Sequence, residues 1–272
     1  MIDVASGIRF ERDGARARIV LDRPAAGNAI DLPMAKALVA AAILCDQDET
    51  IRCVELTGEG RFFCVGGDVA AFAGAENTAA FLSELAGVLH MALARLARMA
   101  KPLVVAVNGP AAGAGVSLAA LGDLVLAKRS AHFTLAYGAI GLTPDGGATW
   151  LLPRLIGLRR AQDLIMSNRR VPAEEAALIG LITAMVEDAD FAAETDAACA
   201  RLVQGPTAAL GAAKALLAAS FANGLESQME LEARAIAAAG ARAESREGVR
   251  AFLEKRPPNF SSLDTQGSTA RQ

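Results

Sequence analysis

The chain has 272 residues, of which 53% are hydrophobic and 21% charged, and its formal net charge is −3 at pH 7. This length and apolar fraction are typical of a folded protein with a sizeable core and exclude a disordered chain. A slightly acidic chain is also poorly suited to bind nucleic acid or an anionic membrane, so we expect neither as a partner.

The first residues and the cysteines indicate a cytoplasmic protein. Residues 1–14 contain acidic side chains and no basic segment followed by an apolar one, so we expect no signal peptide. No run approaches the roughly 18 successive apolar residues of a membrane span. We expect inert core thiols at the four cysteines, which form no CxxC pair or ligand cluster: Cys45, Cys53, Cys64 and Cys199. We also expect no metal or redox cofactor.

In chain order, the first half predicts strands that alternate with helices. Residues 8–12 and 17–21 flank Asp13–Gly14, which is typical of a β-hairpin. A helix follows Asp31, with Asp31 as its cap and Pro33 in its first turn. A long amphipathic helix is predicted over 81–99, and further strands over 53–56, 103–107 and 124–127. Such alternation indicates a parallel sheet with helical crossovers, and therefore the α/β class.

After about residue 146 the pattern becomes helical. Helices are predicted over 161–166, 173–178, 190–202, 207–221, 225–239 and 245–253, with a short strand at 184–186. We therefore divide the chain into an α/β core (1–200), an alanine-rich helical region (201–258) and a polar tail (259–272) that we expect to be disordered.

The glycine-rich segment 101–127 is the most informative one for function. The predicted strand 103–107 leads through a turn to Gly113 and Gly115 at the start of a helix, where free backbone N–H groups can bind an anion. A dinucleotide fingerprint fits poorly, because Leu118 stands where the third glycine belongs and Asp123 comes too early. A nucleophile elbow around Ser117 lacks a convincing histidine partner.

A third interpretation is one half of an oxyanion hole, which requires a second N–H donor. Residues 61–69 supply one, because a tight turn with Gly66 and Gly67 follows the predicted strand 53–56. Two such turns in one parallel sheet can direct N–H groups at one carbonyl oxygen. The two histidines, His90 and His132, have no partner motif and are expected to be structural.

Six segments in order then resemble the enoyl-CoA hydratase/isomerase family, also called the crotonase superfamily. They are 21–30 (LDRPAAGNAI), 61–68 (RFFCVGGD), 101–127, 141–147 (GLTPDGG), 152–157 (LPRLIG) and 247–256 (EGVRAFLEKR). The resemblance covers about residues 5–258. It implies a spiral of ββα units with a helical C-terminal trimerisation region, assembled as a homotrimer or a dimer of trimers.

The resemblance also implies an acyl-CoA thioester as substrate. The N–H groups of Gly67 and Ala114 match the two donors that bind the thioester oxygen, although relatives often have glycine at the second position. We expect the substrate or its CoA part to be bound by Arg23, Asn28, Arg61, Val65, Gly66, Asp68, Tyr137 and Lys255. Lys255 matches a position that commonly reaches the CoA of a neighbouring subunit.

The chain departs from the hydratase pattern at both catalytic glutamates, which are replaced by Ser117 and Tyr137. The remaining acid is Asp145, which matches the acid/base of the isomerase branch, including epoxyphenylacetyl-CoA isomerases. Its alternative role is to cap the helix that follows. We expect Tyr137 to line the pocket rather than to take part in chemistry. The sequence therefore favours an enoyl-CoA isomerase; the alternatives are a hydratase with a non-standard acid/base and a non-catalytic acyl-CoA-binding subunit.

Overall fold

A six-stranded sheet lies at the centre of the protein, of which the computed structural model describes residues 6–263. Its strands, in spatial order, are β1 (Ile8–Asp13), β2 (Arg16–Leu21), β3 (Cys53–Gly58), β4 (Leu103–Val107), β6 (Leu124–Lys128) and β9 (Ala184–Val186). β1 and β2 pair antiparallel, and all later neighbours in this sheet pair parallel. Parallel neighbours need crossover connections, so the predicted α/β class is confirmed.

Local signals explain where the first elements begin. Gly14 has φ +54° in the turn between β1 and β2, a backbone conformation that glycine adopts without strain. α1 (Leu32–Gln47) starts after Asp31, whose carboxylate accepts a hydrogen bond from the N–H of Met34. α3 (Thr78–Arg98) starts after Asn77 in the same way. The expected hairpin and the Asp31 cap are both confirmed.

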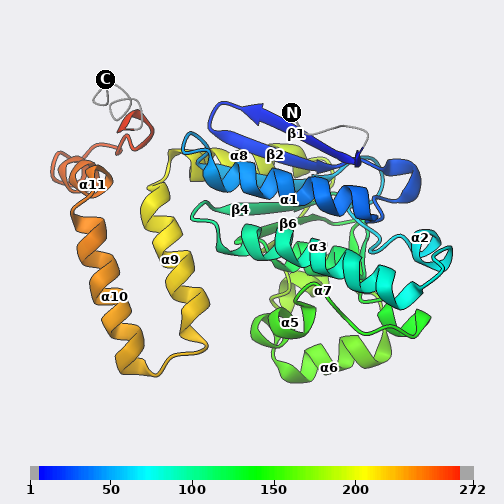
Figure 1. Cartoon of the computed structure of the whole chain (residues 1–272). Coiled ribbons are helices and arrows are strands. Elements are labelled where there is room, and N and C mark those ends of the chain that lie inside the picture. The colour runs from blue at the N-terminus through cyan, green and yellow to red at the C-terminus, as the bar shows by residue number, and fades with distance from the viewer. Residues whose placement is uncertain (1–5, 264–272) are drawn as a thin grey trace.

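The central sheet has a core on each face. Val54 and Val105 point into the main core, where α1 and α3 lie side by side over the sheet (Figure 1). Cys53 and Val104, their neighbours along the strands, instead pack with Cys199 of α8 (Phe191–Gln204) on the other face. Successive side chains of a strand point to opposite faces, so both faces of these strands read as apolar.

A second, smaller sheet was not predicted. It contains β5 (Ala111–Ala112), β7 (His132–Thr134) and β8 (Val171–Pro172), in the order β5-β7-β8. Strands of two or three residues leave no alternation of apolar and polar side chains to detect. The remaining helices of the body are α2 (Val69–Ala73), α4 (Ala114–Ala120), α5 (Ala148–Ile156), α6 (Leu158–Ser167) and α7 (Ala173–Leu178).

α3 is, among residues 6–263, the one helix long and apolar enough to cross a membrane by length and composition. Its leucines Leu85, Leu89, Leu93 and Leu96 are buried in the main core, where α3 packs against α1. The apolar face of α3 is thus used within the protein.

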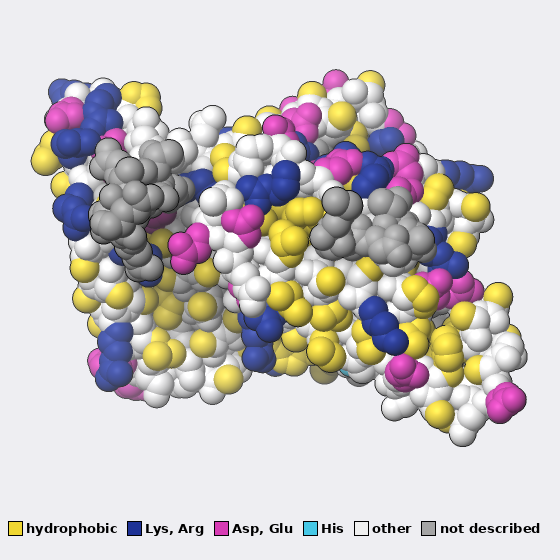
Figure 2. Space-filling model, turned by 45° about the horizontal axis from the view of Figure 1, so that its top comes forward, with side chains coloured by type: hydrophobic (Ala, Val, Ile, Leu, Met, Phe, Trp, Pro, Cys, Tyr) yellow, Lys and Arg dark blue, Asp and Glu magenta, His cyan; other side chains and the backbone are white. Residues whose placement is uncertain are grey.

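The C-terminal helices form an arm beside the body. α9 (Thr207–Ser220) packs against the body through Gly211, where a Cβ would lie 2.2 Å from the carbonyl oxygen of Ala100. α10 (Leu225–Gly240) and α11 (Ala243–Leu253) continue away from the sheet (Figure 1). Figure 2 shows hydrophobic side chains on the left-hand side of the molecule, where α9 and α10 stand. α10 has no buried residue.

Two expectations about boundaries need correction. The predicted division at residue 200 falls inside α8, which covers the main sheet, so the separate helical region begins with α9. In the tail, Ser261–Leu263 forms a short 3₁₀ helix rather than disordered chain. Residues 264–272 of that tail lie outside the described residues.

All four cysteines are buried, as expected. Burial raises the pKa of the Cys64 thiol to about 12 and that of Cys45 to about 12, so both stay protonated at neutral pH. These thiols serve as small apolar groups.

Candidate active site

Two backbone turns meet at the carboxyl ends of β3 and β4. The N–H of Phe63 donates to the carbonyl of Pro110 over 3.1 Å, and the N–H of Ala112 donates to the carbonyl of Cys64 over 2.8 Å. β3 and β4 are parallel neighbours, so the segments that follow them leave the sheet at the same edge and can pair. The pairing carries the glycine turn at 66–67 next to the start of α4.

The N–H groups of Gly67 and Ala114 are free for a ligand. No residue within 6–263 accepts a hydrogen bond from either, and both residues line the same apolar cavity. Gly66 has φ +99°, and a Cβ on it would lie 3.0 Å from the carbonyl oxygen of Ala112 and 3.4 Å from the nitrogen of Ala114. Only glycine allows this close approach. The expected convergence of the two turns is therefore present.

Asp145 lies in the turn before α5, and hydrogen bonds to three side chains hold this turn. The Tyr137 hydroxyl donates to Asp145 Oδ1 over 2.6 Å, and the Ser117 hydroxyl donates to the Asp145 carbonyl over 2.9 Å. His90 Nε2 accepts a hydrogen bond from the N–H of Gly146 over 3.0 Å. These side chains come from a 3₁₀ helix (Tyr137–Ile140), α4 and α3, respectively. The Asp145 carboxylate thus faces the cavity in a fixed turn.

Tyr137 does more than line the pocket. It is buried, and its burial raises the pKa of the phenol well above its usual range, with a further increase from the Asp145 carboxylate. The hydroxyl therefore stays protonated and donates to Asp145 throughout the neutral range. Tyr137 thus lines the cavity, as expected, and in addition donates this hydrogen bond to Asp145.

His90 was not found as a site residue from the sequence. It lies on α3, and its Nε2 is 3.6 Å from Asp145 Oδ2. Its side chain is 49% exposed, and it accepts a hydrogen bond from Gly146 although the sequence showed no partner motif for it. The sequence offered one signal for His90: it is a polar residue on an otherwise apolar helix, between Leu89, which is buried, and Met91, which is exposed.

The cavity beside these groups has a volume of about 490 Å³. Its apolar wall comes mainly from α2, α3 and the segment 139–142, and includes Phe72, Leu82, Leu85, Ala86, Leu89, Ala139, Ile140 and Leu142. Val65, Gly66, Tyr137 and Asp145 also line it. None of the described lining residues is basic, so the cavity suits an uncharged apolar group.

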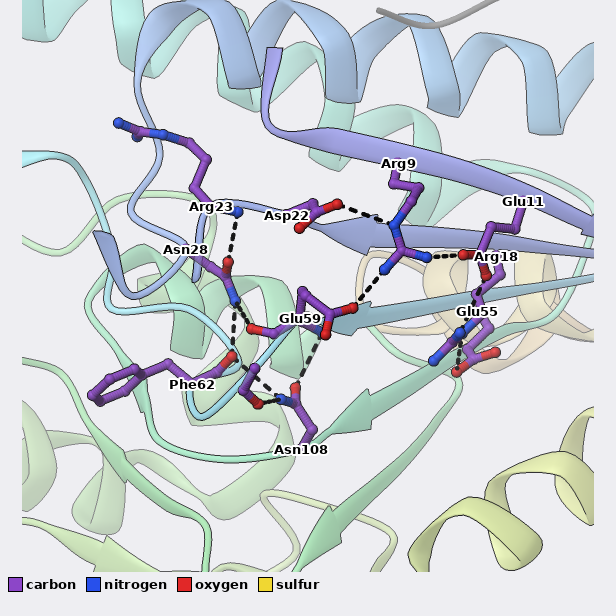
Figure 3. A network of polar contacts seen from close by, with 12 residues as sticks. Arg9, Glu11, Arg18, Asp22, Arg23, Asn28, Glu55, Glu59, Phe62 and Asn108 are labelled. Carbon is purple, nitrogen blue, oxygen red and sulfur yellow. Dashed lines mark hydrogen bonds and ion pairs between the residues drawn. The ribbon is translucent and has the colours of Figure 1, made fainter. Parts of the chain in front are cut away.

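Asn28 supports the site from within the protein instead of facing a ligand. It is fully buried, and its amide nitrogen donates to the carbonyls of Glu59 and Phe62 (Figure 3) and to that of Phe63. Its amide oxygen accepts from the N–H of Arg23. The expected contact with the substrate is thus replaced by four hydrogen bonds that shape the segment before Gly66.

Arg23 and Asp68 are paired with one another. Arg23 Nη2 donates to Asp68 Oδ2 over 3.0 Å, and Arg23 Nη1 lies 3.2 Å from Asp31 Oδ2. Asp68 also caps α2 by accepting from the N–H of Ala71. Both side chains therefore hold the turn that contains Gly67, and Arg23 is partly neutralised.

Arg61 and Lys255 are exposed, as expected of residues that bind the CoA part of a substrate. The Arg61 guanidinium lies 5.3 Å from the ring centre of Phe62, at the loop beside the first turn. Lys255 follows α11, at the end of the molecule opposite α2 (Figure 1). Within one chain, Lys255 is therefore not brought to the cavity.

The chain is similar to known proteins over nearly all of its length. Residues 11–263 match the family model described as enoyl-CoA hydratase/isomerase. A "Probable enoyl-CoA hydratase" of Rhodobacter capsulatus is 42% identical over 253 residues, which cover 93% of this chain and 97% of the relative. The 1,2-epoxyphenylacetyl-CoA isomerase of Escherichia coli K12 is 39% identical over 247 residues, or 89% and 93% of the two chains. The crystal structure of an enoyl-CoA hydratase from Polaromonas sp. JS666 has a TM-score of 0.88 at 30% identity, with 93% of this chain and 98% of that chain covered.

Proposed function

Since the chain belongs to the enoyl-CoA hydratase/isomerase family, we propose that it shifts the double bond of a 3-enoyl-CoA to give the 2-enoyl-CoA. One observation carries the proposal: of the described residues that line the cavity, Asp145 is the only one with a carboxylate. Isomerisation needs one acid/base, because the same group can remove a proton and return it. The relative named as an isomerase supports the same reaction class.

In the proposed reaction the thioester oxygen accepts hydrogen bonds from the N–H groups of Gly67 and Ala114. Asp145 removes a proton from C2, and the electron pair of that C–H bond moves toward the carbonyl, which gives a dienolate. The two N–H groups stabilise the negative charge that develops on the oxygen. Asp145 then returns the proton to C4, so that the double bond lies between C2 and C3.

In the proposed mechanism the two oxygens of Asp145 have different roles. Oδ1 accepts the Tyr137 hydroxyl, which leaves Oδ2 for the substrate proton. The described apolar lining favours an acyl chain without a charged end. The reaction uses only side chains and backbone groups of this chain, and we expect the rate to be the same after treatment with a metal chelator.

Hydration is the second candidate, because a relative that is 42% identical is named as a hydratase. In that reaction Asp145 would activate water for addition to a 2-enoyl-CoA. The product would be heavier than the substrate by one water, whereas isomerisation leaves the mass unchanged. A non-catalytic acyl-CoA-binding protein would yield neither product.

The experiment is to incubate the protein with 3-enoyl-CoA and, separately, with 2-enoyl-CoA, and to analyse products by mass and retention time. Asp145→Asn should lower the isomerisation rate by about 10²- to 10⁴-fold, the usual contribution of a general base. Asp163→Asn, which changes an exposed aspartate on α6, is the matched control and should keep the wild-type rate. Isomerisation that persists in Asp145→Asn contradicts the mechanism, and binding without turnover in the wild type favours the binding protein.

The arm suggests how copies of the chain assemble. We propose a homotrimer, or two such trimers, in which the arm of one copy packs against the body of another. The support is a set of apolar side chains on α9 and α10 that are exposed in the described chain: Leu217, Leu225, Met229 and Ile236. The same contact would carry Lys255 toward the site of a neighbouring copy.

A further inference from the structure

His90 lies where α3 passes the turn that contains Asp145. Its Nε2 accepts a hydrogen bond from the N–H of Gly146 over 3.0 Å and is 3.6 Å from Asp145 Oδ2. Gly146 has φ +60°, and a Cβ on it would lie 2.9 Å from the Cβ of Ser117, so this turn packs tightly against α4. The peptide that joins Asp145 and Gly146 is thus held by Ser117 at its carbonyl and by His90 at its N–H.

The hydrogen bond from Gly146 depends on the charge of His90. An imidazole nitrogen has one lone pair in the plane of the ring, so Nε2 accepts this N–H only when it carries no proton. Neutral His90 therefore carries its proton on Nδ1. Once Nε2 is protonated, two N–H donors face each other across 3.0 Å, and the contact with Gly146 is lost. The new donor instead faces Asp145 Oδ2.

We propose that neutral His90 is a positioning residue, which holds the Asp145–Gly146 peptide in the orientation that proton transfer requires. Protonation of His90 releases that peptide. It also places an N–H donor against Asp145 Oδ2, the oxygen that does not bind Tyr137 and that would accept the substrate proton. The inference rests on the proposed isomerase function. It predicts that the reaction slows when His90 becomes protonated.

Few other charges face His90 within the described structure. Asp145 and the Tyr137 phenol bonded to it are the groups on the side of the cavity. α2 carries no titratable side chain. α1 pairs with charges of α3 more than one helical turn away from His90, in the ion pairs Lys36–Glu84 and Arg95–Asp46. Asp145 is therefore the charged group that faces His90 among the described residues.

The test compares His90→Gln, His90→Phe and His132→Gln with the wild type in the isomerase assay from about pH 5 to 9. A glutamine Oε1 can accept the Gly146 N–H and does not titrate, whereas phenylalanine has no acceptor. His90→Phe should lower kcat about fivefold to tenfold at pH 8 with little change in KM, the size expected for one hydrogen bond. His90→Gln should have a higher kcat than His90→Phe at pH 8. The acid limb of its pH profile, where kcat decreases, should lie at lower pH than in the wild type.

His132→Gln is the matched control, because His132 is the other histidine of the chain and lies on β7. It should keep the acid limb of the wild type. It also leaves one histidine in the nitrogen NMR spectrum, where His90 should show the Nδ1–H tautomer at pH 8. This measurement needs no catalysis and does not depend on whether the His90 variants fold.

Three results would overturn the proposal. In His90→Gln, the decrease of kcat at low pH could stay at the wild-type pH, or it could move to higher pH. In the NMR spectrum, neutral His90 could be the Nε2–H tautomer. The second would mean that His90 acts only as a positive charge beside Asp145. Failure of the isomerase function is recognised separately, because wild-type rates would then be absent or would survive in Asp145→Asn.

Discussion

At the scale of single residues, the main feature of the site is the set of hydrogen bonds that hold Asp145 and its turn. The sequence indicated Asp145 and the two N–H donors, because each lies in a glycine-rich turn that also carries the family resemblance. It did not indicate His90 or the role of Tyr137 as a donor. Both act on Asp145 through contacts between different elements, and such contacts leave no local pattern in the sequence.

Removing the Tyr137 hydroxyl tests its contact with Asp145. Tyr137→Phe keeps the ring in place but loses a hydrogen bond to a carboxylate, so we expect kcat to fall about 10- to 100-fold with little change in thermal stability. Steady-state kinetics with 3-enoyl-CoA measure the effect. An unchanged kcat would show that the hydroxyl does not orient Asp145.

Tyr137 is the one tyrosine of the chain, so its ionisation can be followed by ultraviolet absorbance. Burial and the Asp145 carboxylate raise the pKa of this phenol. In the wild type, tyrosinate should form only well above the usual range for tyrosine. In Asp145→Asn one of the two causes is removed, and tyrosinate should form at lower pH than in the wild type.

At the scale of elements, the strongest patterns were predicted well and the shortest strands were missed. β4, α7 and β9 match the predicted segments residue for residue. β5, β7 and β8 have two or three residues each and form through pairing across the chain, for example Ala111 with Phe133. That small sheet fixes Gly113, whose N–H donates to the carbonyl of Thr134. Part of the site geometry therefore depends on pairing that propensity does not encode.

A cluster of polar contacts connects α11 to the segment that follows it, and its centre is the buried carboxylate of Glu247 on α11. It accepts hydrogen bonds from Arg256, from the N–H of Asn259 and from Arg250, over 2.7, 2.9 and 2.6 Å. These contacts, with Arg256 first, hold the pKa of Glu247 well below its usual range. Glu247 thus fastens the segment that contains Lys255.

Because the pKa of Glu247 is lower in the folded than in the unfolded protein, its stabilising effect is complete above the unfolded value of about 4.3. The effect is lost as the pH falls below that value. We expect hydrogen-exchange protection of residues 254–260 to decrease below about pH 4.5 in the wild type. Glu247→Gln should lack much of this protection at pH 7, and Glu230→Gln, on the exposed side of α10, should keep it. Equal protection in both variants would contradict this role.

At the scale of the whole molecule, the arm (α9 to α11) is the part whose apolar side chains remain exposed in a single chain. α9 is attached to the body by Lys214, which donates to the carbonyl of Leu96 and to Asp123, whereas α10 packs mainly on α9. The alanine-rich composition predicted a helical region that packs against something. It could not specify the partner, because an exposed apolar face looks the same in sequence as a buried one.

Charges placed on that face should separate the copies. Met229→Glu combined with Ile236→Glu buries two carboxylates in the proposed contact, and we expect the mass by light scattering to fall from that of a trimer or hexamer to that of one chain. Arg234→Ala, on the same helix, should keep the wild-type mass. If Lys255 reaches a neighbouring site, the monomeric variant should also show a higher KM for acyl-CoA. A wild-type protein that is already monomeric would contradict the proposal.

The contact between Gly146 and Ser117 has a consequence for how this site can change over generations. A Cβ on Gly146 would lie 2.9 Å from the Ser117 Cβ and 3.1 Å from its Oγ, and Gly146 has φ +60°, so any larger residue at 146 is strained and displaces Ser117. A lineage that replaces Gly146 must therefore also move Ser117 or the turn that presents Asp145.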